Sequence, residues 1–397
     1  MNLSQRQFLD HTTQPMKWRN LFSSYFVLII SFILLSHCQP PPKGADDQRR
    51  DPPSPTIPPP SSEPPTPPQE PGPIPPLHYQ ACSFNVQFIG QSKKRLNELL
   101  AHYLAENECD LVLIQELIAP PDLRKLPNSP FFGQNSVATY PDGTPHRPNE
   151  ESTKFFLAMY QAGFNGYWLS PEDTGPSAKN QNNSTATEWH VVFFKTSKFT
   201  IAPHLPQGYL DYPVAQHPVY PRVPYAFAFQ DLTQRVDLVF INVHLQPGSA
   251  PADRRKRSEE LRQIRAWIKD QYALSSERDY IIVGDMNIEN AEELAELENN
   301  ILEDFRSLNI QASHMTNTNV RSPKPYDHVL IHPLHTKEIA LEKNFFVLNL
   351  SEFMQPRWPF PELPFPGSPY HHDTFRQYFS DHNAIKFHIV VPHSDDD

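Results

Sequence analysis

The chain has 397 residues, among them 45 prolines and 12 glycines, and its formal net charge is −11. This charge excludes a basic protein that coats nucleic acid through bulk charge, but not an enzyme that meets phosphates through bound metal ions. Three cysteines are too few for a disulfide-rich scaffold or for a zinc site built from cysteines.

An uncharged apolar run extends from Leu21 to Ser36, after two basic residues. This order is typical of an export signal, and the run is shorter than the roughly 20 residues of a full membrane span. The segment LLSHC resembles a bacterial lipoprotein signal with Cys38 as the lipidated residue, although His37 stands where that pattern has a small residue. We predict a leader over residues 1–38 and an exported protein, either a lipoprotein of the cell envelope or outer membrane or a secreted one. A signal anchor is the alternative.

Seventeen of the prolines lie between Gln39 and Pro76, in a segment with almost no apolar residues. Such a composition cannot form a core and favours an extended polyproline II chain. We predict a proline-rich linker over residues 39–78 that tethers a catalytic domain, residues 79–397, to a membrane through the leader. A ligand for a proline-binding module is the alternative.

From Tyr79 onward, short apolar runs alternate with amphipathic stretches. Continuous apolar runs of this length are typical of strands buried on both faces. The stretch KKRLNELLAHYLAEN places five apolar side chains on one helical face, those of Leu96, Leu99, Leu100, Tyr103 and Leu104. The pattern predicts an α/β fold in which helices cover buried sheets.

Several of the apolar runs begin or end at a carboxylate, amide or imidazole side chain. In chain order these are Asn85, Glu116, His244, Asp285, Asn287, Asp327, Asp381 and His382. Hard oxygen ligands suit Mg²⁺ or Mn²⁺ rather than zinc, and histidines supply acid and base chemistry near neutral pH. The combination predicts metal-assisted hydrolysis of a phosphate ester.

The ordered motifs of the chain resemble those of the endonuclease/exonuclease/phosphatase superfamily, and most of all its deoxyribonuclease I branch. They are FNVQFIG, DLVLIQE, TEWHVVFF, RVPYAF, INVHL, GDMN, YDHVLI and SDHNAI, within about Tyr79 to Val391. The choice of branch depends largely on Glu188 of TEW, Arg222 of RVP and His244 of INVHL. The resemblance implies a four-layer α/β sandwich, in which two mixed β-sheets are flanked by helices.

The resemblance also implies the residues of a metal and phosphate site. Glu116 would be the direct ligand of the principal metal, with Asn85 beside it. Asp285 and Asn287 would hold the scissile phosphate and the attacking water, with Asp285 also at the metal. Asp381 would be a metal ligand or the neighbour of one.

Two histidines would move protons in the reaction that the resemblance implies. His382 would be the general base, oriented by Asp327, and His244 the general acid, oriented by Glu188. Which histidine is base and which is acid depends on the polarity of the bound substrate. Arg222 would contact a phosphate, because its planar fork matches phosphate oxygens.

Two further segments have open interpretations. Thr316 and Thr318 precede the YDH motif, where their hydroxyls would bind phosphate oxygens; a plain polar turn is the alternative. The basic run 254–257 opens a predicted helix, and we favour a solvated helix face over contacts to nucleic acid.

Cys82 and Cys109 either pair or remain free thiols.

Together these features predict a divalent-metal-dependent phosphodiester hydrolase that acts as a monomer, a non-specific DNA endonuclease with RNA as a further substrate. Mg²⁺ is the expected metal, with Mn²⁺ as a substitute and Ca²⁺ as an accessory ion. A lipid or small-molecule phosphoesterase of the sphingomyelinase or inositol-phosphate phosphatase type is the first alternative. A non-catalytic binding or toxin-like module is the second.

Overall fold

The computed structural model describes residues 77–174, 187–215 and 217–392, which belong to one compact unit, Pro71–Asp397. The predicted leader with Cys38 and the predicted linker up to residue 76 lie outside the described residues. Among the helices that are described, none is long and apolar enough to cross a membrane.

Two mixed β-sheets form the centre of the described unit. The strands of the first sheet are β1 (His78–Ile89), β2 (Leu111–Leu117), β3 (Gly166–Leu169), β4 (Trp189–Phe194), β12 (Phe346–Val347) and β13 (Ile385–Val390). Their order is β12-β13-β1-β2-β4-β3, and β1 and β2 are parallel. The first strand therefore begins one residue before the predicted start of the domain.

The second sheet consists of β5 (Phe199–Ile201), β6 (Gly208–Tyr209), β7 (Tyr225–Asp231), β8 (Asp237–His244), β9 (Tyr280–Asp285), β10 (Arg306–Ser307) and β11 (Asp327–Ile331). Its order is β10-β11-β9-β8-β7-β5, and β6 also pairs with β7. The central pair β8 and β9 is parallel, whereas β11 runs antiparallel to β9.

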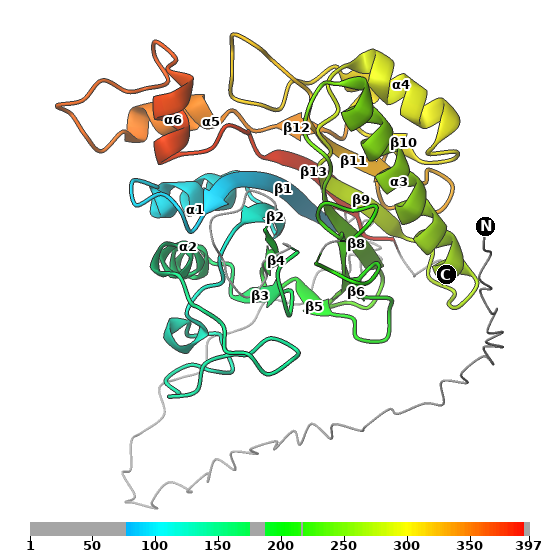
Figure 1. Ribbon diagram of the computed structural model, residues 1–397, viewed down its shortest axis with the longest axis horizontal. Helices are drawn as coiled ribbons and strands as arrows, with labels where there is room; N and C mark the ends of the chain where they lie inside the picture. Colours follow the sequence, from blue (N-terminus) through cyan, green and yellow to red (C-terminus); the bar gives the residue numbers. More distant parts are fainter. Residues whose placement is uncertain (1–76, 175–186, 216, 393–397) are drawn as a thin grey trace, which may run out of the picture. The chain divides into compact units, whose positions relative to one another are not determined.

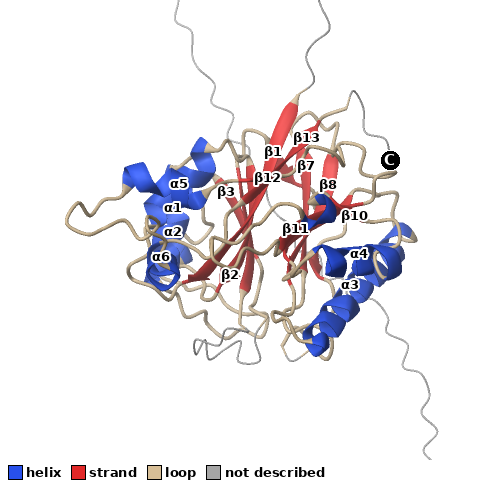
Figure 2. Cartoon of the chain, turned by 90° about the horizontal axis from the view of Figure 1, so that it is seen from above, coloured by secondary structure: helices blue, strands red, loops and turns tan. Residues whose placement is uncertain are grey.

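Helices cover the outer face of each sheet (Figures 1 and 2). The first sheet is covered by α1 (Asn97–Glu106), α2 (Glu150–Gln161), α5 (Leu350–Met354) and α6 (His372–Tyr378). The second is covered by α3 (Pro251–Tyr272) and α4 (Ala291–Asn300). Three short 3-10 turns connect these elements, at Leu123–Lys125, Ile310–Ala312 and Gln355–Arg357. The predicted four-layer sandwich is confirmed.

Alternating side chains of the central strands build two separate cores. In β2, Leu111 and Leu113 join the cluster between the two sheets, whereas Val112 and Ile114 join the cluster beneath α1 and α2. Successive side chains of a strand point to opposite faces, so an uninterrupted apolar run fills both layers. This explains why the strands lack a polar alternation in the sequence.

A disulfide joins the two parallel strands of the first sheet at their amino-terminal ends. Cys82 of β1 and Cys109, just before β2, have Cα atoms 5.8 Å apart, and both side chains are fully buried. The open question of whether they pair is therefore answered in favour of a bridge.

Removal of this bridge is expected to destabilise the domain. The cysteines are 27 residues apart, and closing a loop of that length in the unfolded chain corresponds to about 3–4 kcal/mol. The variant Cys82→Ala/Cys109→Ala should therefore unfold at a clearly lower urea concentration than the oxidised wild type. Equal midpoints, with a thiol assay showing the wild type oxidised, would contradict a stabilising role.

Candidate active site

Neighbouring strands of the second sheet bring three of the predicted residues side by side. His244 at the end of β8 is the register partner of Asp285 at the end of β9. Asp285 is in turn the partner of Asp327, the first residue of the antiparallel β11. His382 arrives from the connection between α6 and β13 and forms an isolated bridge with Asn317.

Gly284 of the GDMN motif allows this strand to lie close to its neighbour. Its φ is +141°, and a Cβ at this position would lie 2.1 Å from the backbone oxygen of Val243. A side chain at position 284 would therefore push β9 away from β8. The glycine thus sets the position of Asp285, the next residue.

Two adjacent bulges turn the ends of β1 and β2 toward the second sheet. The register between these strands shifts after Asn85, and the register between β2 and β4 shifts after Ile114. Gln87, Phe88 and Glu116 have positive φ values of 48°, 55° and 63°. Bulges re-aim side chains at the rims of sheets, and here they direct Glu116 toward Asp285.

A cavity of about 390 Å³ opens over these strand ends. Seven of the predicted residues line it: Glu116, Arg222, His244, Asp285, Asn287, Asp381 and His382. Three others, Asn85, Glu188 and Asp327, are buried and hydrogen-bonded or ion-paired to the lining residues. The structure therefore brings together ten of the twelve residues that the sequence placed at a phosphate site.

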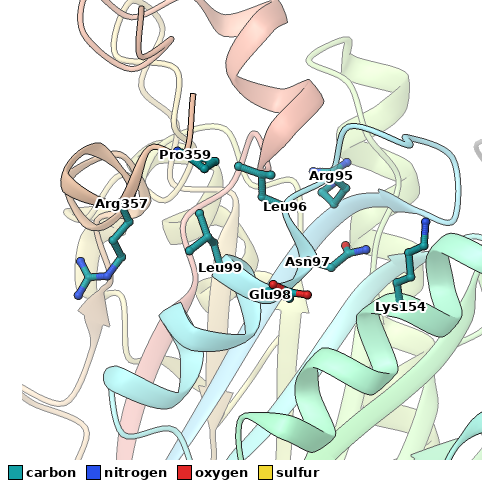
Figure 3. A pocket seen from close by; sticks show the side chains of 8 residues that line it. All are labelled: Arg95, Leu96, Asn97, Glu98, Leu99, Lys154, Arg357 and Pro359. Carbon is teal, nitrogen blue, oxygen red and sulfur yellow. The ribbon is translucent and has the colours of Figure 1, made fainter. Parts of the chain in front are cut away.

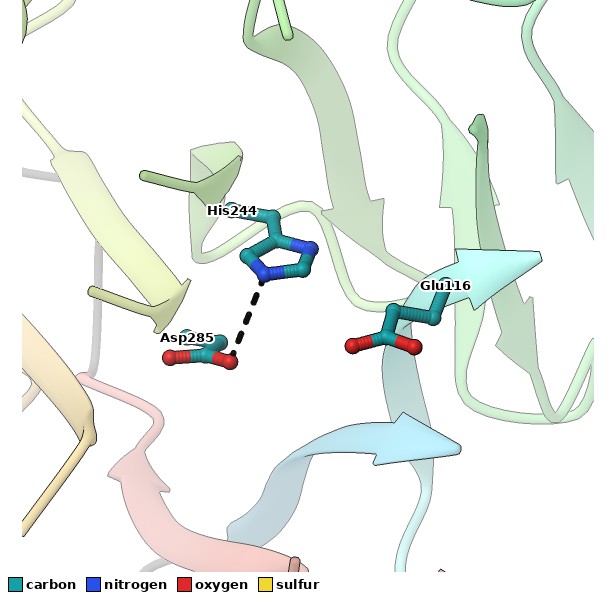
Figure 4. A group of neighbouring side chains, drawn as sticks. All are labelled: Glu116, His244 and Asp285. Atoms are coloured by element: carbon teal, nitrogen blue, oxygen red, sulfur yellow. Dashed lines mark ion pairs between the residues drawn. The ribbon is translucent and has the colours of Figure 1, made fainter. Parts of the chain in front are cut away.

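Two carboxylate–imidazole pairs face one another across Asp285. His244 Nδ1 lies 2.7 Å from Glu188 Oε1, and His382 Nδ1 lies 2.8 Å from Asp327 Oδ2. The Nε2 atom of each ring lies 3.5 Å from the same atom, Asp285 Oδ2. Figure 4 shows the ring of His244 with this nitrogen directed at Asp285, and Glu116 opposite. Both rings thus present Nε2 to one point.

The surrounding charges hold both rings ready to carry a proton. Burial lowers the pKa of His382, but Asp327 and Asp285 outweigh burial and hold the pKa well above its ordinary value. For His244, burial and Arg222 lower the pKa, and the carboxylates of Glu188 and Asp285 outweigh them and raise it. Burial raises the pKa of Glu188, but His244 and Arg222 outweigh burial and lower the pKa to about 2.

Glu188 links the acid–base pair to the metal-ligand candidates. Besides His244, its carboxylate accepts a hydrogen bond from the backbone N–H of Glu116 at 3.2 Å and lies 3.4 Å from Arg222 Nη1. Arg222 also donates to the backbone oxygens of His244 and Leu245, at 2.8 and 2.6 Å. The arginine predicted to bind phosphate therefore also fixes the backbone at the end of β8.

The carboxylates of the cavity fit a hard divalent cation. Glu116, Asp285 and His244 offer ligand atoms that all lie within 4.8 Å of one another. Burial raises the pKa of Glu116 to about 7, and Asp381 Oδ1 is a buried oxygen without a hydrogen-bond partner among the described residues. A divalent cation would compensate both features, because it neutralises clustered carboxylates and accepts oxygen ligands.

Asn85 turns its amide nitrogen, not its oxygen, toward these carboxylates. Nδ2 donates to Glu116 Oε1 and to Asp285 Oδ2, both at 2.9 Å, while Oδ1 accepts from the backbone N–H of Gln87. In this arrangement Asn85 orients two carboxylates and gives no oxygen to a metal. Asn287 is likewise anchored, since its side chain donates to Leu245 O and its backbone N–H to Asp285 Oδ1.

The two threonine hydroxyls predicted to bind phosphate have partners within the protein in this structure. Thr316 is fully buried, and its hydroxyl accepts a hydrogen bond from the backbone N–H of Asp327 at 2.9 Å. The Thr318 hydroxyl bonds Tyr370 and Ser380 instead. Both hydroxyls support the segments that carry Asp327 and His382, and neither residue lines the cavity.

Sequence reasoning missed several supporting residues. Gln87 Nε2 donates to Asp381 Oδ2 at 2.8 Å, and the Ser380 hydroxyl accepts from the backbone N–H of His382. Tyr326 lines the cavity, with its ring centroid 5.8 Å from that of His382. Gln87, Ser380 and Tyr326 stand inside or beside the recognised motifs, which is the signal that could have found them.

The expectation of a solvated face for the basic run 254–257 is wrong for Arg257. Its side chain is fully buried, and it donates to Glu293 Oε1 and to the backbone oxygens of Gln246 and Gly248. Glu260, one turn further along α3, accepts from the backbone N–H of Gln246. Helix α3 therefore holds the segment after His244 in place, and this segment forms one wall of the cavity.

Replacement of Glu188 by glutamine tests the arrangement around His244. The variant loses one of the two carboxylates that raise the pKa of His244, whereas burial and Arg222 still lower it, so the pKa falls. We expect activity to fall by about 10–100-fold, and the alkaline limb of the kcat/KM profile to move to lower pH if His244 is the acid. The control Glu292→Gln, on the exposed face of α4, should change neither. An unmoved alkaline limb in Glu188→Gln would contradict this role.

Comparisons with known proteins give structural likenesses only. No protein-family model matches the chain, and no curated protein matches it. Among solved structures, it is similar to an endonuclease/exonuclease/phosphatase family protein from Bacteroides thetaiotaomicron, at 14% identity and a TM-score of 0.46, covering 80% of this chain and 99% of the other. It is also similar to the human Nocturnin catalytic domain with a bound sulfate anion, at 12% identity and a TM-score of 0.45, covering 79% of this chain and 95% of the other. A third similar structure is truncated Caenorhabditis elegans TDP2, at 12% identity and a TM-score of 0.44, covering 79% of this chain and 97% of the other.

The first of these structures carries the family name that the motifs of this chain indicate. At such identities and TM-scores, the likenesses carry no information about substrate.

Proposed function

We propose that the protein is a divalent-metal-dependent phosphodiester hydrolase that cleaves DNA as a non-specific endonuclease. The observation that carries this proposal is the convergence of two carboxylate-oriented imidazoles on Asp285, beside the buried carboxylate of Glu116. Paired imidazoles supply a base for an attacking water and an acid for a departing oxygen. Clustered carboxylates supply a cation site for a phosphate group.

His382 and His244 divide the proton transfers. His382, whose Nδ1 is bonded to Asp327, takes a proton from the attacking water at Nε2 while the new P–O bond forms. His244, whose Nδ1 is bonded to Glu188, gives a proton from Nε2 to the leaving oxygen while the old P–O bond breaks. Both rings are held in the required orientation by their carboxylates, so little ordering remains for the reaction itself.

Mg²⁺ is the metal we propose, held by Glu116 and Asp285 with Asp381 close by. When bound, it supplies positive charge against the charge that develops on the phosphate oxygens. With these carboxylates neutralised, the pull that raises the pKa of His382 is weaker, so the ring can act as a base near neutral pH. Arg222 lines the same cavity and adds a second positive group for the phosphate.

DNA is our choice of substrate because of Glu188 and Arg222, the residues whose motifs favour the nuclease branch. Two observations support this choice: Glu188 Oε1 lies 2.7 Å from His244 Nδ1, and Arg222 lines the cavity. RNA is a further candidate with the same backbone phosphates. A lipid or inositol phosphate would use the same proton transfers, and it is the alternative that the experiment below separates.

We also propose that the protein is exported and that its catalytic domain works outside the cytoplasm. The buried bridge between Cys82 and Cys109 supports this proposal, because structural disulfides persist in oxidising compartments. Lipidation at Cys38 remains a prediction from the LLSHC segment. Mass spectrometry of the membrane fraction would test it, and an unmodified chain that begins upstream of Cys38 would contradict it.

A substrate panel tests the proposed function. Full-length protein is incubated with supercoiled plasmid, linear RNA, sphingomyelin vesicles and inositol phosphates, each with MgCl₂ and with EDTA. We expect nicked and linear plasmid in MgCl₂ and intact plasmid in EDTA. Hydrolysis of sphingomyelin or inositol phosphates by a preparation that leaves the plasmid intact would replace the nuclease by the lipid or small-molecule phosphoesterase.

A further inference from the structure

A layer of polar side chains interrupts the apolar cluster between the two sheets. Its members are Ser83 of β1, Gln115 of β2, His190 of β4 and Asn242 of β8, each at most 2% exposed. The first three belong to the first sheet, and Asn242 belongs to the second. Buried polar groups cost free energy unless each finds a partner, so this polar layer calls for a reason beyond packing.

The four side chains form one connected hydrogen-bond network. Gln115 Nε2 donates to Asn242 Oδ1 at 2.7 Å and to Ser83 Oγ at 3.1 Å. Asn242 Nδ2 lies 3.2 Å from His190 Nδ1. Burial lowers the pKa of His190 to about 4, so at neutral pH the ring is uncharged, accepts at Nδ1 and carries its proton on Nε2. Every side-chain nitrogen and oxygen of the polar layer has a partner, which favours one rigid arrangement.

Asn242 fixes the start of the bulge that carries Glu116. Its Nδ2 donates to the backbone oxygen of Ile114 at 2.9 Å. The register between β2 and β4 shifts directly after Ile114, and Glu116 follows two residues later with a positive φ of 63°. Gln115, between them, packs against the GDMN motif, because a Cβ on Gly284 would lie 3.1 Å from Gln115 Nε2. The direction of Glu116 therefore depends on a hydrogen bond from the opposite sheet.

His190 fixes the backbone beside Arg222 in the same way. Its Nε2 donates to the backbone oxygen of Val223 at 2.8 Å, and Val223 directly follows Arg222. Arg222 lines the catalytic cavity and donates to the backbone oxygen of His244, the residue that ends β8. The network thus reaches the side of the cavity with the phosphate candidate as well as the side with the metal-ligand candidate.

The polar layer lies one step below the catalytic residues along the same strands. Three of its members stand two positions from a residue of the site: Ser83 from Asn85, His190 from Glu188 and Asn242 from His244. Residues two apart on a strand point to the same face, so each of the three lies next to a site residue on that face. Gln115 departs from this spacing because the bulge after Ile114 turns the next residue, Glu116, to the same side.

The bulge of β1 is held from the side of α1 as well. Arg95 Nη2 donates to the backbone oxygen of Gln87, which has a positive φ of 48°. Figure 3 shows Arg95 just before α1, in the wall of a cavity of about 410 Å³. The strand ends at the catalytic site are therefore fixed from α1 and, between the sheets, by the polar layer.

We propose that His190 and Asn242 are positioning residues of the active site. By bonding backbone oxygens across the two sheets, they set the separation between Glu116, the proposed metal ligand, and Arg222, the proposed phosphate contact. The inference rests on the proposed phosphodiesterase function. Neither side chain touches the substrate or moves a proton in the reaction. A substitution that keeps the donor and the acceptor should therefore keep the site.

Metal binding tests the role of Asn242. Asn242→Leu has a side chain of similar size without donor or acceptor, and the matched control is Tyr79→Phe. Tyr79 donates to Asp231 Oδ2 at 3.0 Å, a buried hydrogen bond that also joins the two sheets but lies near the start of β1. The probe is Mn²⁺ alone, with the free ion measured by electron paramagnetic resonance. We expect a lower Tm in both variants, but Mn²⁺ binding weakened about 10-fold only in Asn242→Leu.

Hydrolysis of bis(4-nitrophenyl) phosphate at saturating Mg²⁺ tests the role of His190. His190→Gln keeps a donor and an acceptor but loses the ring, whereas His190→Phe keeps a ring but loses both. We expect His190→Gln to hold kcat/KM within about threefold of wild type and His190→Phe to lose about 10-fold or more. The loss should appear chiefly as a higher KM, because a displaced Arg222 binds the phosphate less well before the reaction starts.

Each result decides the positioning role. Wild-type Mn²⁺ affinity in folded Asn242→Leu, or equal losses of kcat/KM in the two His190 variants, would overturn it. If Asn242→Leu does not fold, the comparison of the two His190 variants decides. A wild type that binds Mn²⁺ but hydrolyses no diester would contradict the proposed function alone, and the Mn²⁺ comparison would still decide the role of Asn242. A wild type that binds no Mn²⁺ would contradict both.

Discussion

Replacing His382 by alanine is expected to lower turnover by about 10²–10⁴-fold while the protein stays folded. In the proposed mechanism the imidazole of His382 takes the proton of the attacking water, and its removal leaves the carboxylates of Asp285 and Asp327 in place. His244→Ala should have an effect of the same order, because the leaving oxygen then departs without a proton donor. Steady-state rates on plasmid DNA and on a small diester measure both.

Two controls separate lost chemistry from lost structure. His314→Ala removes an exposed histidine and should keep activity within twofold. Circular dichroism and Tm should be close to wild type in all three variants. Wild-type turnover in both His382→Ala and His244→Ala would refute the assignment of these side chains as acid and base.

Replacing Arg257 by alanine is expected to cost about 3–5 kcal/mol of stability. The change leaves Glu293 buried without its partner and removes both N–H bonds to the segment after His244. Chemical denaturation should show a much lower midpoint. Where the folded fraction can still be measured, activity per folded molecule should also fall, because Gly248 and its neighbours form one wall of the catalytic cavity.

The neighbouring Arg254 is a matched control on the same helix. It is 40% exposed and lies 3.9 Å from the other oxygen of the same glutamate, so Arg254→Ala should cost less than about 1 kcal/mol. A loss in Arg257→Ala no larger than that in Arg254→Ala would contradict the structural role of the buried pair.

The fold and the main site residues could be predicted because they share one signal. Uninterrupted apolar runs give buried strands, and the polar residues His244 and Asp285 lie at the ends of neighbouring strands that meet at the same edge. The order of the sequence motifs then identified Glu188 and Arg222 as site residues, which hydrophobic periodicity alone does not single out. The predicted four-layer sandwich holds in the structure because these strands pair in register as parallel and antiparallel neighbours.

The remaining features depend on geometry that sequence patterns do not carry. Glu116 reaches the cavity through a bulge with positive φ, and a bulge leaves no mark in a run of buried residues. Arg257 looks like one of four surface charges, but its partner lies 36 residues away on a different helix. Thr316 has the right chemistry for a phosphate, yet its hydroxyl is used to fix the backbone of Asp327.

The most direct test of the central claim is cleavage of supercoiled plasmid by wild-type protein and by Asp285→Asn. Asp285 is the point at which both imidazoles and the cation candidates meet. We predict nicking by the wild type in MgCl₂, no nicking after EDTA, and recovery when Mg²⁺ is added back, whereas folded Asp285→Asn is inactive under all three conditions. Nicking that persists in EDTA, or at wild-type rate in Asp285→Asn, would contradict a metal-dependent phosphodiesterase at this site.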